Sequence, residues 1–129
     1  MQGKRGLVMG VANHNSIAYG CARALADAGA ELAITYQGEA FGKRARPLAE
    51  KLGCDTLIDV DVDHEDSIDR AFAELREKWG TLDFVLHAIA FSDKEELKGR
   101  YADTSRANFQ KTMLVSCFSF TEAAARWRR

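Results

Sequence analysis

Four short apolar runs alternate along this sequence with segments of helical periodicity, and this order restricts the fold more than any other feature. The runs that predict buried strands cover residues 6–9, 32–36, 56–60 and 84–89. The segments that predict helices cover residues 16–28, a stretch ending at 52, residues 68–79 and residues 108–127. Near-continuous apolar strands joined by amphipathic helices are typical of parallel sheets covered on both faces, so we predict a doubly wound α/β sheet.

Three local expectations follow from helix chemistry. Pro47 lies inside the second helical segment, where an interior proline costs about 3 kcal/mol, so we expect a kink there or a shorter helix that begins at it. The periodicity places Ile17, Cys21, Ala24, Leu25 and Ala28 on the buried face of the first helix. Asp103 or Thr104 is expected to cap the last helix.

The composition excludes several classes of protein. The formal net charge of −1 and the absence of long blocks of like charge predict no surface for nucleic acid. No apolar run is long enough to cross a membrane. Cys21, Cys54 and Cys117 lack the spacing of zinc ligands, and free thiols are typical of the reducing cytoplasm, where we expect this protein.

The C-terminal end carries a local excess of positive charge. Arg126, Arg128 and Arg129 surround Trp127 in the sequence. We interpret these arginines as cations near the negative pole of a helix end, and contact with a membrane or a nucleic acid is the alternative.

Residues 10–20, with the sequence Gly-Val-Ala-Asn-His-Asn-Ser-Ile-Ala-Tyr-Gly, carry the strongest local signal. They lie where the first predicted strand gives way to the first helix, and in doubly wound sheets phosphates bind at such a helix N-terminus. Gly10 would let the backbone approach a ligand, and Ser16 offers a hydroxyl. The GxGxxG fingerprint is absent, so the alternative is an ordinary helix cap made by Asn13, Asn15 or Ser16.

Three aspartates mark the end of the third predicted strand. Asp59, Asp61 and Asp63 alternate with valines, and residues two apart in a strand share a face. These carboxylates could bind magnesium, accept a hydrogen bond from the amine of a base, or cap the next helix. A cap or a solvated edge is the favoured interpretation.

His87 lies inside the fourth apolar run. We interpret it as a core histidine that is hydrogen-bonded to a backbone group, and a catalytic role is the alternative. Trp79 and the phenylalanines are expected in the core.

Taken in order, these motifs resemble the bacterial NADH-dependent enoyl-[acyl-carrier-protein] reductases of the short-chain dehydrogenase/reductase superfamily. The resemblance runs from Gly3 to about Ala125. The segments that carry it are Gly10-Val-Ala, Ser16-Ile-Ala-Tyr-Gly20, Glu31-Leu-Ala-Ile-Thr-Tyr-Gln37, Asp61-Val62, Ser67-Ile68-Asp69, Phe72-Ala-Glu-Leu75 and His87-Ala-Ile-Ala-Phe91. Any one of them alone would be a weak signal, but their order and separation together are specific.

The resemblance implies a Rossmann-like fold and a set of cofactor-binding residues. It implies that the pyrophosphate is lined by Gly10, Ser16 and Ile17, the adenosine ribose by Gln37, the adenine edge by Asp61 and Val62, and the nicotinamide ribose by Ala88, Ile89 and Ala90. Many relatives have glycine at the position of Ala90, so its methyl group crowds the backbone beside the reacting ring.

The residues after the second strand favour NADH over NADPH. An NADPH site needs a cation there to bind the 2′-phosphate, and Gln37-Gly38-Glu39 supplies none. The carboxylate of Glu39 would repel the phosphate. Lys43, Arg44 and Arg46 lie further along and could reach back.

The catalytic pair that the resemblance calls for is missing from residues 1–129, so we expect no catalytic residue here. The proton donor of these reductases is a tyrosine followed seven residues later by a lysine. Tyr36 and Lys43 have that separation, but Tyr36 ends the second strand on the adenosine side. The fourth strand would also be a bare edge. We therefore expect one dinucleotide-binding domain over residues 1–129, truncated after about four strands and incomplete at its C-terminus.

The expected function is that of the NADH-binding part of an enoyl-[acyl-carrier-protein] reductase, which reduces trans-2-enoyl thioesters in bacterial fatty-acid synthesis. By resemblance, the intact enzyme would be a homotetramer acting on acyl-carrier-protein-bound substrate, and this chain alone would be inactive. A non-catalytic cofactor-binding remnant or another short-chain dehydrogenase is the alternative. A phosphoacceptor module would need an acidic pair after the first strand, where Met9-Gly10-Val11 stands.

Overall fold

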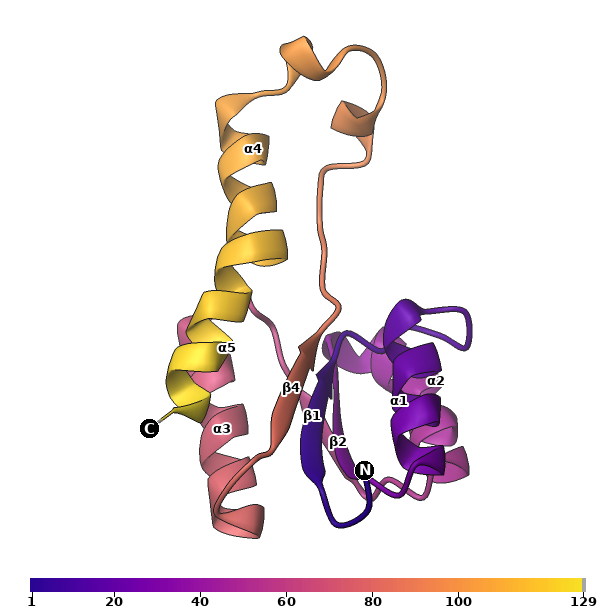
Figure 1. Ribbon diagram of the computed structural model, residues 1–129. Coiled ribbons are helices and arrows are strands. Elements are labelled where there is room, and N and C mark those ends of the chain that lie inside the picture. The colour runs from indigo at the N-terminus through magenta and orange to yellow at the C-terminus, as the bar shows by residue number, and fades with distance from the viewer. Residues whose placement is uncertain (129) are drawn as a thin grey trace.

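The computed structural model describes residues 1–128 and contains a four-stranded parallel sheet with helices on both faces (Figure 1). The strands are β1 (Arg5–Met9), β2 (Glu31–Tyr36), β3 (Thr56–Asp59) and β4 (Phe84–His87). Their order in the sheet is β3-β2-β1-β4. The prediction of a Rossmann-like, doubly wound parallel sheet is therefore confirmed, with β3 and β4 slightly shorter than the apolar runs that predicted them.

The strand order reverses between β1 and β4. The chain passes from β1 outward to β2 and β3, then crosses back to place β4 on the other side of β1. Val8 consequently pairs with Ile34 of β2 on one side and with Leu86 of β4 on the other. In open α/β sheets, ligands bind beyond the carboxyl ends of the strands at such a reversal.

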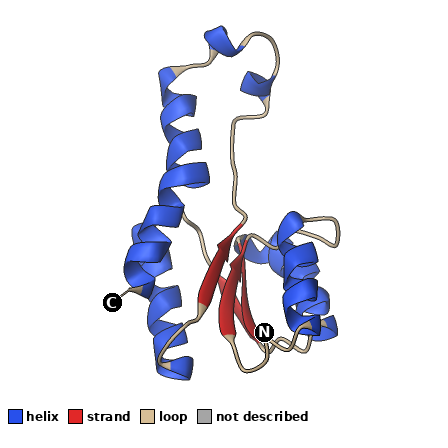
Figure 2. Cartoon of the chain, viewed as in Figure 1, coloured by secondary structure: helices blue, strands red, loops and turns tan. Residues whose placement is uncertain are grey.

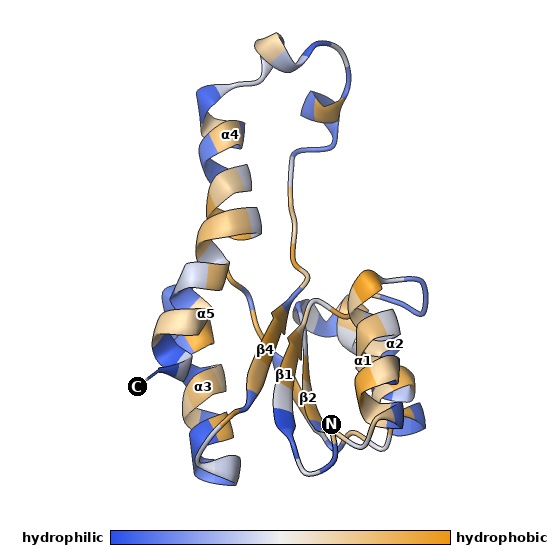
Figure 3. Cartoon of the chain, in the orientation of Figure 1, coloured by the Kyte–Doolittle hydropathy of each residue, from blue (hydrophilic) through white to orange (hydrophobic). Residues whose placement is uncertain are grey.

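Each face of the sheet has its own apolar core, because successive side chains of a strand point to opposite faces. On one face, Val8 packs with α1 (Ile17–Asp27) and α2 (Gly38–Lys51). On the other face, Leu7 and Met9 pack with α3 (Glu65–Trp79) and α5 (Ser119–Trp127). Figure 3 shows the apolar residues concentrated on the strands.

The buried face of α1 differs from the prediction. Ala18 and Ala22 are the buried residues of this helix, and Leu25 packs against the same core as predicted. Cys21 is half-buried, whereas Ile17, at 79%, and also Ala24 and Ala28 are exposed. Small side chains at positions 18 and 22 let the helix approach the sheet closely, and the first residue of the helix is turned outward.

Pro47 does not begin a shorter helix, so this alternative of the prediction is wrong, and the kink stays a prediction. The helix runs without a break from Gly38 to Lys51 with Pro47 inside it. Pro47 and Lys43 both lie on the exposed side of this helix. The carbonyl group of Lys43, which loses its usual N–H partner, can therefore be solvated.

The C-terminal helical region, which we call the arm, projects beyond the sheet at α4 (Arg106–Met113) and lies beside α3 at α5 (Figure 2). It consists of α4, a π-helical turn over Leu114–Phe118 and α5. The cap of α4 is Ser105, whose hydroxyl accepts a hydrogen bond from the N–H of Asn108, so the prediction of Asp103 or Thr104 was wrong. Two short 3-10 turns, Glu95–Leu97 and Tyr101–Asp103, precede it.

The expectation that the phenylalanines belong to the core was wrong for most of them. Phe72 and Trp79 are buried. The phenylalanines that are more than a third exposed are Phe41, Phe91, Phe109, Phe118 and Phe120. Three of these five, Phe109, Phe118 and Phe120, lie in the arm, and Phe91 follows β4.

The C-terminal arginine cluster is partly explained by contacts with α3. The guanidinium of Arg126 contacts the carboxylates of Asp69 at 2.6 Å and Glu65 at 2.9 Å, and the indole N–H of Trp127 donates to the carbonyl of Leu82. These contacts dock α5 on α3. Arg129 lies outside the described residues. None of the helices in the described part of the chain is both long and apolar enough to cross a membrane.

Candidate functional site

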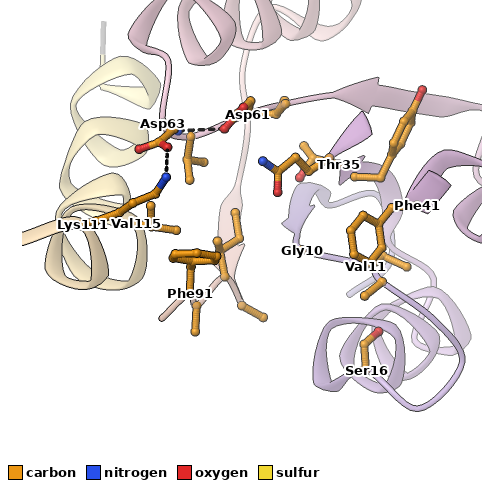
Figure 4. A pocket seen from close by; sticks show the side chains of 18 residues that line it. Gly10, Val11, Ser16, Thr35, Phe41, Asp61, Asp63, Phe91, Lys111 and Val115 are labelled. Carbon is orange, nitrogen blue, oxygen red and sulfur yellow. Dashed lines mark hydrogen bonds and ion pairs between the residues drawn. The ribbon is translucent and has the colours of Figure 1, made fainter. Parts of the chain in front are cut away.

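A cavity of about 450 Å³ opens beyond the carboxyl ends of the strands, at the reversal between β1 and β4 (Figure 4). Eight of the nine residues predicted to bind a cofactor line it: Gly10, Ser16, Gln37, Asp61, Val62, Ala88, Ile89 and Ala90. The ninth, Ile17, is absent from the lining because Ala18 and not Ile17 faces the sheet. The sequence positions therefore converge in space as expected, and their individual roles toward a ligand stay predictions.

Gly10 forms the base of this cavity, where the ends of β1 and β4 meet. Its φ angle is +98°, a conformation that favours glycine. A Cβ atom built at Gly10 would lie 2.3 Å from the carbonyl oxygen of Ala88. The N–H of Ala88 in turn donates to the carbonyl of Met9 at 3.1 Å. Only a residue without a side chain allows this close approach of the two strand ends.

Ser16 caps α1 and also lines the cavity. Its hydroxyl accepts a hydrogen bond from the N–H of Tyr19 at 3.3 Å and donates to the carbonyl of Asn13 at 2.7 Å. The cap interpretation of the sequence is confirmed for Ser16. The cap does not conflict with ligand binding, because the first turn of the helix presents its positive pole at the same end.

The three aspartates at the end of β3 and just after it have different partners. The carboxylate of Asp59 accepts a hydrogen bond from the N–H of Gly38 at 2.8 Å. That of Asp61 accepts one from the N–H of Asp63 at 3.0 Å and lies 3.2 Å from Nδ1 of His64. No group of three metal-binding side chains occurs within residues 1–128.

Asp61 is held in its charged form at the cavity wall. Partial burial raises the pKa of its carboxyl, but hydrogen bonds from the Asp63 N–H and from the side chains of Gln37 and His64 outweigh this effect and hold the pKa below its ordinary value. At neutral pH the cavity therefore contains a carboxylate acceptor beside the amide of Gln37.

An ion pair that the sequence did not predict closes one side of the cavity. The ammonium of Lys111 in α4 lies 2.9 Å from a carboxylate oxygen of Asp63 and 5.2 Å from the centre of the Phe91 ring. All three residues line the cavity (Figure 4). Contact with Asp63 raises the pKa of Lys111. A signal was present in the sequence, since Lys111 and Val115 are four residues apart on one helix face, but nothing in the sequence showed which wall that face meets.

Uncharged side chains complete the lining, and most of them were not singled out from the sequence. They include Val11, Ala12, Thr35, Phe41, Val60 and Val115. The guanidinium of Arg44 lies 6.0 Å from the ring of Phe41, outside the lining, so it does not reach into the cavity. Lys111 is consequently the one cation among the lining residues.

His87 has a side-chain partner instead of the expected backbone partner. Its Nε2 lies 2.7 Å from the hydroxyl of Ser119, and that hydroxyl donates its single hydrogen to the carbonyl of Val115 at 2.7 Å. Nε2 of His87 must then carry a proton and donate it to Ser119. Burial lowers the pKa of His87, which is therefore neutral at pH 7. These contacts give His87 a structural role between β4 and α5.

Tyr36 and Lys43 do not form a catalytic pair in this structure. Tyr36 is 9% exposed, and its ring packs on Gly42, where an added Cβ atom would lie 2.7 Å from the ring. Lys43 lies on the exposed side of α2. Tyr36 thus ends β2 as expected, and its side chain is packed against α2.

Comparison with known proteins agrees with this geometry. The family model described as "Enoyl-(Acyl carrier protein) reductase" matches residues 10–129. An enoyl-[acyl-carrier-protein] reductase [NADH] of Rhizobium meliloti is 61% identical over 126 residues, which cover 98% of this chain and 47% of that protein. The corresponding reductase of Rickettsia bellii is 51% identical over 96% of this chain and 47% of its own length.

Solved structures agree as well. The enoyl-(acyl-carrier-protein) reductase of Anaplasma phagocytophilum, crystallised in complex with NAD, superposes with a TM-score of 0.95 at 53% identity and is covered to 48% of its chain. The reductase of Aquifex aeolicus gives a TM-score of 0.96 at 40% identity, with 50% of its chain covered. The present chain spans about half the length of the curated relatives it matches. It belongs to the enoyl-(acyl-carrier-protein) reductase family.

Proposed function

We propose that residues 1–129 are a dinucleotide-binding domain and supply the NADH site of an enoyl-[acyl-carrier-protein] reductase that reduces trans-2-enoyl thioesters in bacterial fatty-acid synthesis. The observation that carries this proposal is the convergence of Gly10, Ser16, Gln37, Asp61 and residues 88–90 on one cavity at the strand reversal. The family membership of the chain and the NADH named for its relatives support the same conclusion.

The residues of the cavity fit a dinucleotide. Gly10 adds no side chain to the base of the cavity, and the start of α1 beside it offers a positive helix pole for a pyrophosphate. The charged carboxylate of Asp61 can accept a hydrogen bond from the exocyclic amine of adenine, and the amide of Gln37 can bind a ribose hydroxyl. NADH, when bound, supplies the hydride that is transferred to the β-carbon of the enoyl thioester.

NADH is the proposed cofactor because the cavity offers nothing for a 2′-phosphate. Gln37, Gly38 and Glu39 follow β2 and carry no positive charge. The one cation of the lining, Lys111, is already paired with Asp63. The carboxylate of Glu39 would repel a 2′-phosphate bound near it.

Further properties of the intact enzyme belong to the proposal. Its substrate would be an enoyl group carried on acyl carrier protein, and its assembly a homotetramer. Exposed apolar residues along α4 and the π-helical turn, such as Phe109, Met113 and Phe118, are consistent with a surface that is covered in an assembly. The free thiols Cys21, Cys54 and Cys117 favour a cytoplasmic location.

A fluorescence titration of the 129-residue chain with NADH and NADPH tests the binding function. We expect saturable binding of NADH and weaker binding of NADPH, and tighter binding of NADPH would contradict the cofactor assignment. An assay with a crotonyl thioester should give no NADH oxidation, because these residues contain no tyrosine–lysine pair in a catalytic position. If a full-length native product bound NADH without any turnover, the alternative of a cofactor-binding remnant would be correct.

A further inference from the structure

In the part of the chain that the structure describes, the ion pair between Lys111 and Asp63 is the only polar side-chain link between α4 and the sheet-and-helix body formed by residues 1–87. Within residues 1–128, no other ion pair or side-chain hydrogen bond joins residues 106–113 to residues 1–87. The polar contacts of the arm with the body otherwise come from its later part, through Ser119, Arg126 and Trp127. Among the polar side-chain contacts of α4, this ion pair is thus the one that links the helix to the turn after β3.

A second face of the same helical region holds the opposite wall of the cavity. Asn108, Thr112 and Ser116 recur at four-residue spacing and therefore lie along one side of the helix. Ser116 binds both backbone groups of Phe91, accepting from its N–H at 3.0 Å and donating to its carbonyl at 3.2 Å. Asn108 and Thr112 continue this pattern on Ser92 and Asp93.

Together, these contacts connect the two walls at one end of the cavity. Asp63 is paired with Lys111, the helix connects Lys111 to Ser116, and Ser116 binds Phe91, which follows β4. The ammonium of Lys111 also lies over the Phe91 ring, so it touches both walls. If the ion pair is lost, α4 and the attached residues 91–93 lose their polar link to the turn after β3 and can move away from it together.

These contacts are also coupled to the adenine side of the cavity through Asp63. The backbone N–H of Asp63 donates to the carboxylate of Asp61, the proposed acceptor for the adenine amine. Anchoring Asp63 from across the cavity therefore fixes the turn that orients Asp61. The side chains of Asp63 and Lys111 are 30% and 50% exposed, so the pair is partly screened but not fully solvated.

We propose that the Asp63–Lys111 ion pair is a latch that fixes α4 and residues 91–93 against the turn after β3, and thereby keeps the adenosine end of the cavity in the shape that binds the dinucleotide. Asp63 and Lys111 are positioning residues and do not touch the ligand. This inference rests on the proposed function as a dinucleotide site.

The test measures the dissociation constant for NADH in four variants of the 129-residue chain. Lys111→Met and Asp63→Asn each remove the ion pair, and each should weaken binding about fivefold. Lys111→Arg keeps the ion pair and should bind like the unchanged chain. The exchanged pair Asp63→Lys/Lys111→Asp should recover most of the lost affinity, because it restores the link with opposite polarity.

Lys98→Met is a matched control. Lys98 also forms an ion pair in the segment before α4, with Glu95 at 2.8 Å, but neither residue lines the cavity. The substitution makes the same change in net charge as Lys111→Met. It should leave the affinity for NADH unchanged, and a loss equal to that of Lys111→Met would refute the latch.

Hydrogen exchange measured without ligand distinguishes a failure of the latch proposal from a failure of the proposed function on which it rests. Lys111→Met should speed hydrogen exchange at residues 91–93 and leave the β1 amides protected. The double variant Asp63→Lys/Lys111→Asp should reverse this change. If these effects occur but the unchanged chain does not bind NADH, the proposed function fails and the latch remains. If NADH binds but the exchanged pair recovers neither affinity nor protection, Lys111 contacts the ligand directly or only stabilises the fold, and the latch is wrong.

Discussion

Replacement of Gly10 by alanine tests the close approach of the strand ends on which the cavity depends. Two separate effects should destabilise this variant. The φ angle of +98° is unfavourable for any residue with a Cβ atom, by about 1–2 kcal/mol. In addition, the new Cβ atom would lie 2.3 Å from the carbonyl oxygen of Ala88 and 3.1 Å from the side chain of Ile89, so the end of β4 must shift.

Two other glycines allow these effects to be separated. Gly99 has a φ angle of +85° and no atom within 4 Å of a built Cβ, so Gly99→Ala should cost only the conformational part, about 1 kcal/mol. Gly20 lies inside α1 with open space around it and a negative φ, so Gly20→Ala should stabilise the chain by about 0.5–1 kcal/mol.

For Gly10→Ala, displacement of packed atoms adds about 1–3 kcal/mol to the conformational cost, for a total near 3 kcal/mol. This corresponds to a decrease in Tm of about 10 °C for a chain of 129 residues. Urea unfolding, followed by the fluorescence of the buried Trp79, measures the free energy of unfolding for the three variants. If Gly10→Ala and Gly99→Ala destabilise the chain equally, the contact between Gly10 and Ala88 is not tight, and the argument for the base of the cavity fails.

Three further predictions concern the cap, the cofactor preference and the histidine. Ser16→Ala should lower the free energy of unfolding by about 1 kcal/mol through loss of the α1 cap, whereas Ser16→Asp should retain stability; equal losses in urea unfolding would argue against the cap. Glu39→Arg should shift the ratio of the NADPH and NADH dissociation constants about tenfold toward NADPH, and an unchanged ratio in titrations would place the 2′ position elsewhere. Burial lowers the pKa of His87 below its ordinary value of about 6.5, so below that pH the unfolded chain binds more protons than the folded chain and stability falls as the pH decreases. His87→Gln should reduce this loss between pH 7.5 and pH 5.5, and an identical loss would assign it to other groups.

The order of strands and helices could be predicted because it depends on local periodicity. The four apolar runs are the four strands, and the first three helical segments end within one residue of positions 28, 52 and 79, each just before a glycine with positive φ. Such patterns depend on residues that are close in the sequence, so they can be recognised without knowledge of tertiary contacts. The helix that continues through Pro47 is the exception, because exposure to solvent relieves the missing hydrogen bond.

The lining residues that follow strands could be predicted, whereas those contributed by the arm could not. Gly10, Gln37, Asp61 and residues 88–90 all follow strands, so the parallel sheet brings them to one edge. Lys111 reaches the same cavity from the arm, and its pairing with Asp63 depends on how α4 lies over the sheet. That placement is a tertiary contact that no spacing in the sequence encodes.

The π-helical turn over Leu114–Phe118 also escaped prediction. Its residues are compatible with an α-helix, and periodicity read over the whole region indicates one continuous helix. A π turn leaves no separate signal in a single sequence, although such turns occur often at functional sites. Here the turn contains Val115, which lines the cavity, and Ser116, which binds Phe91.

The most direct test of the central claim is hydrogen exchange of the 129-residue chain with and without saturating NADH. The claim predicts slower exchange at residues 10–17, 37, 61–62 and 88–90, the segments that meet at the cavity, with little change at residues 101–110 of the arm. If NADH leaves exchange at those four segments unchanged, or protects residues 101–110 instead, the cavity at the strand reversal is not the dinucleotide site.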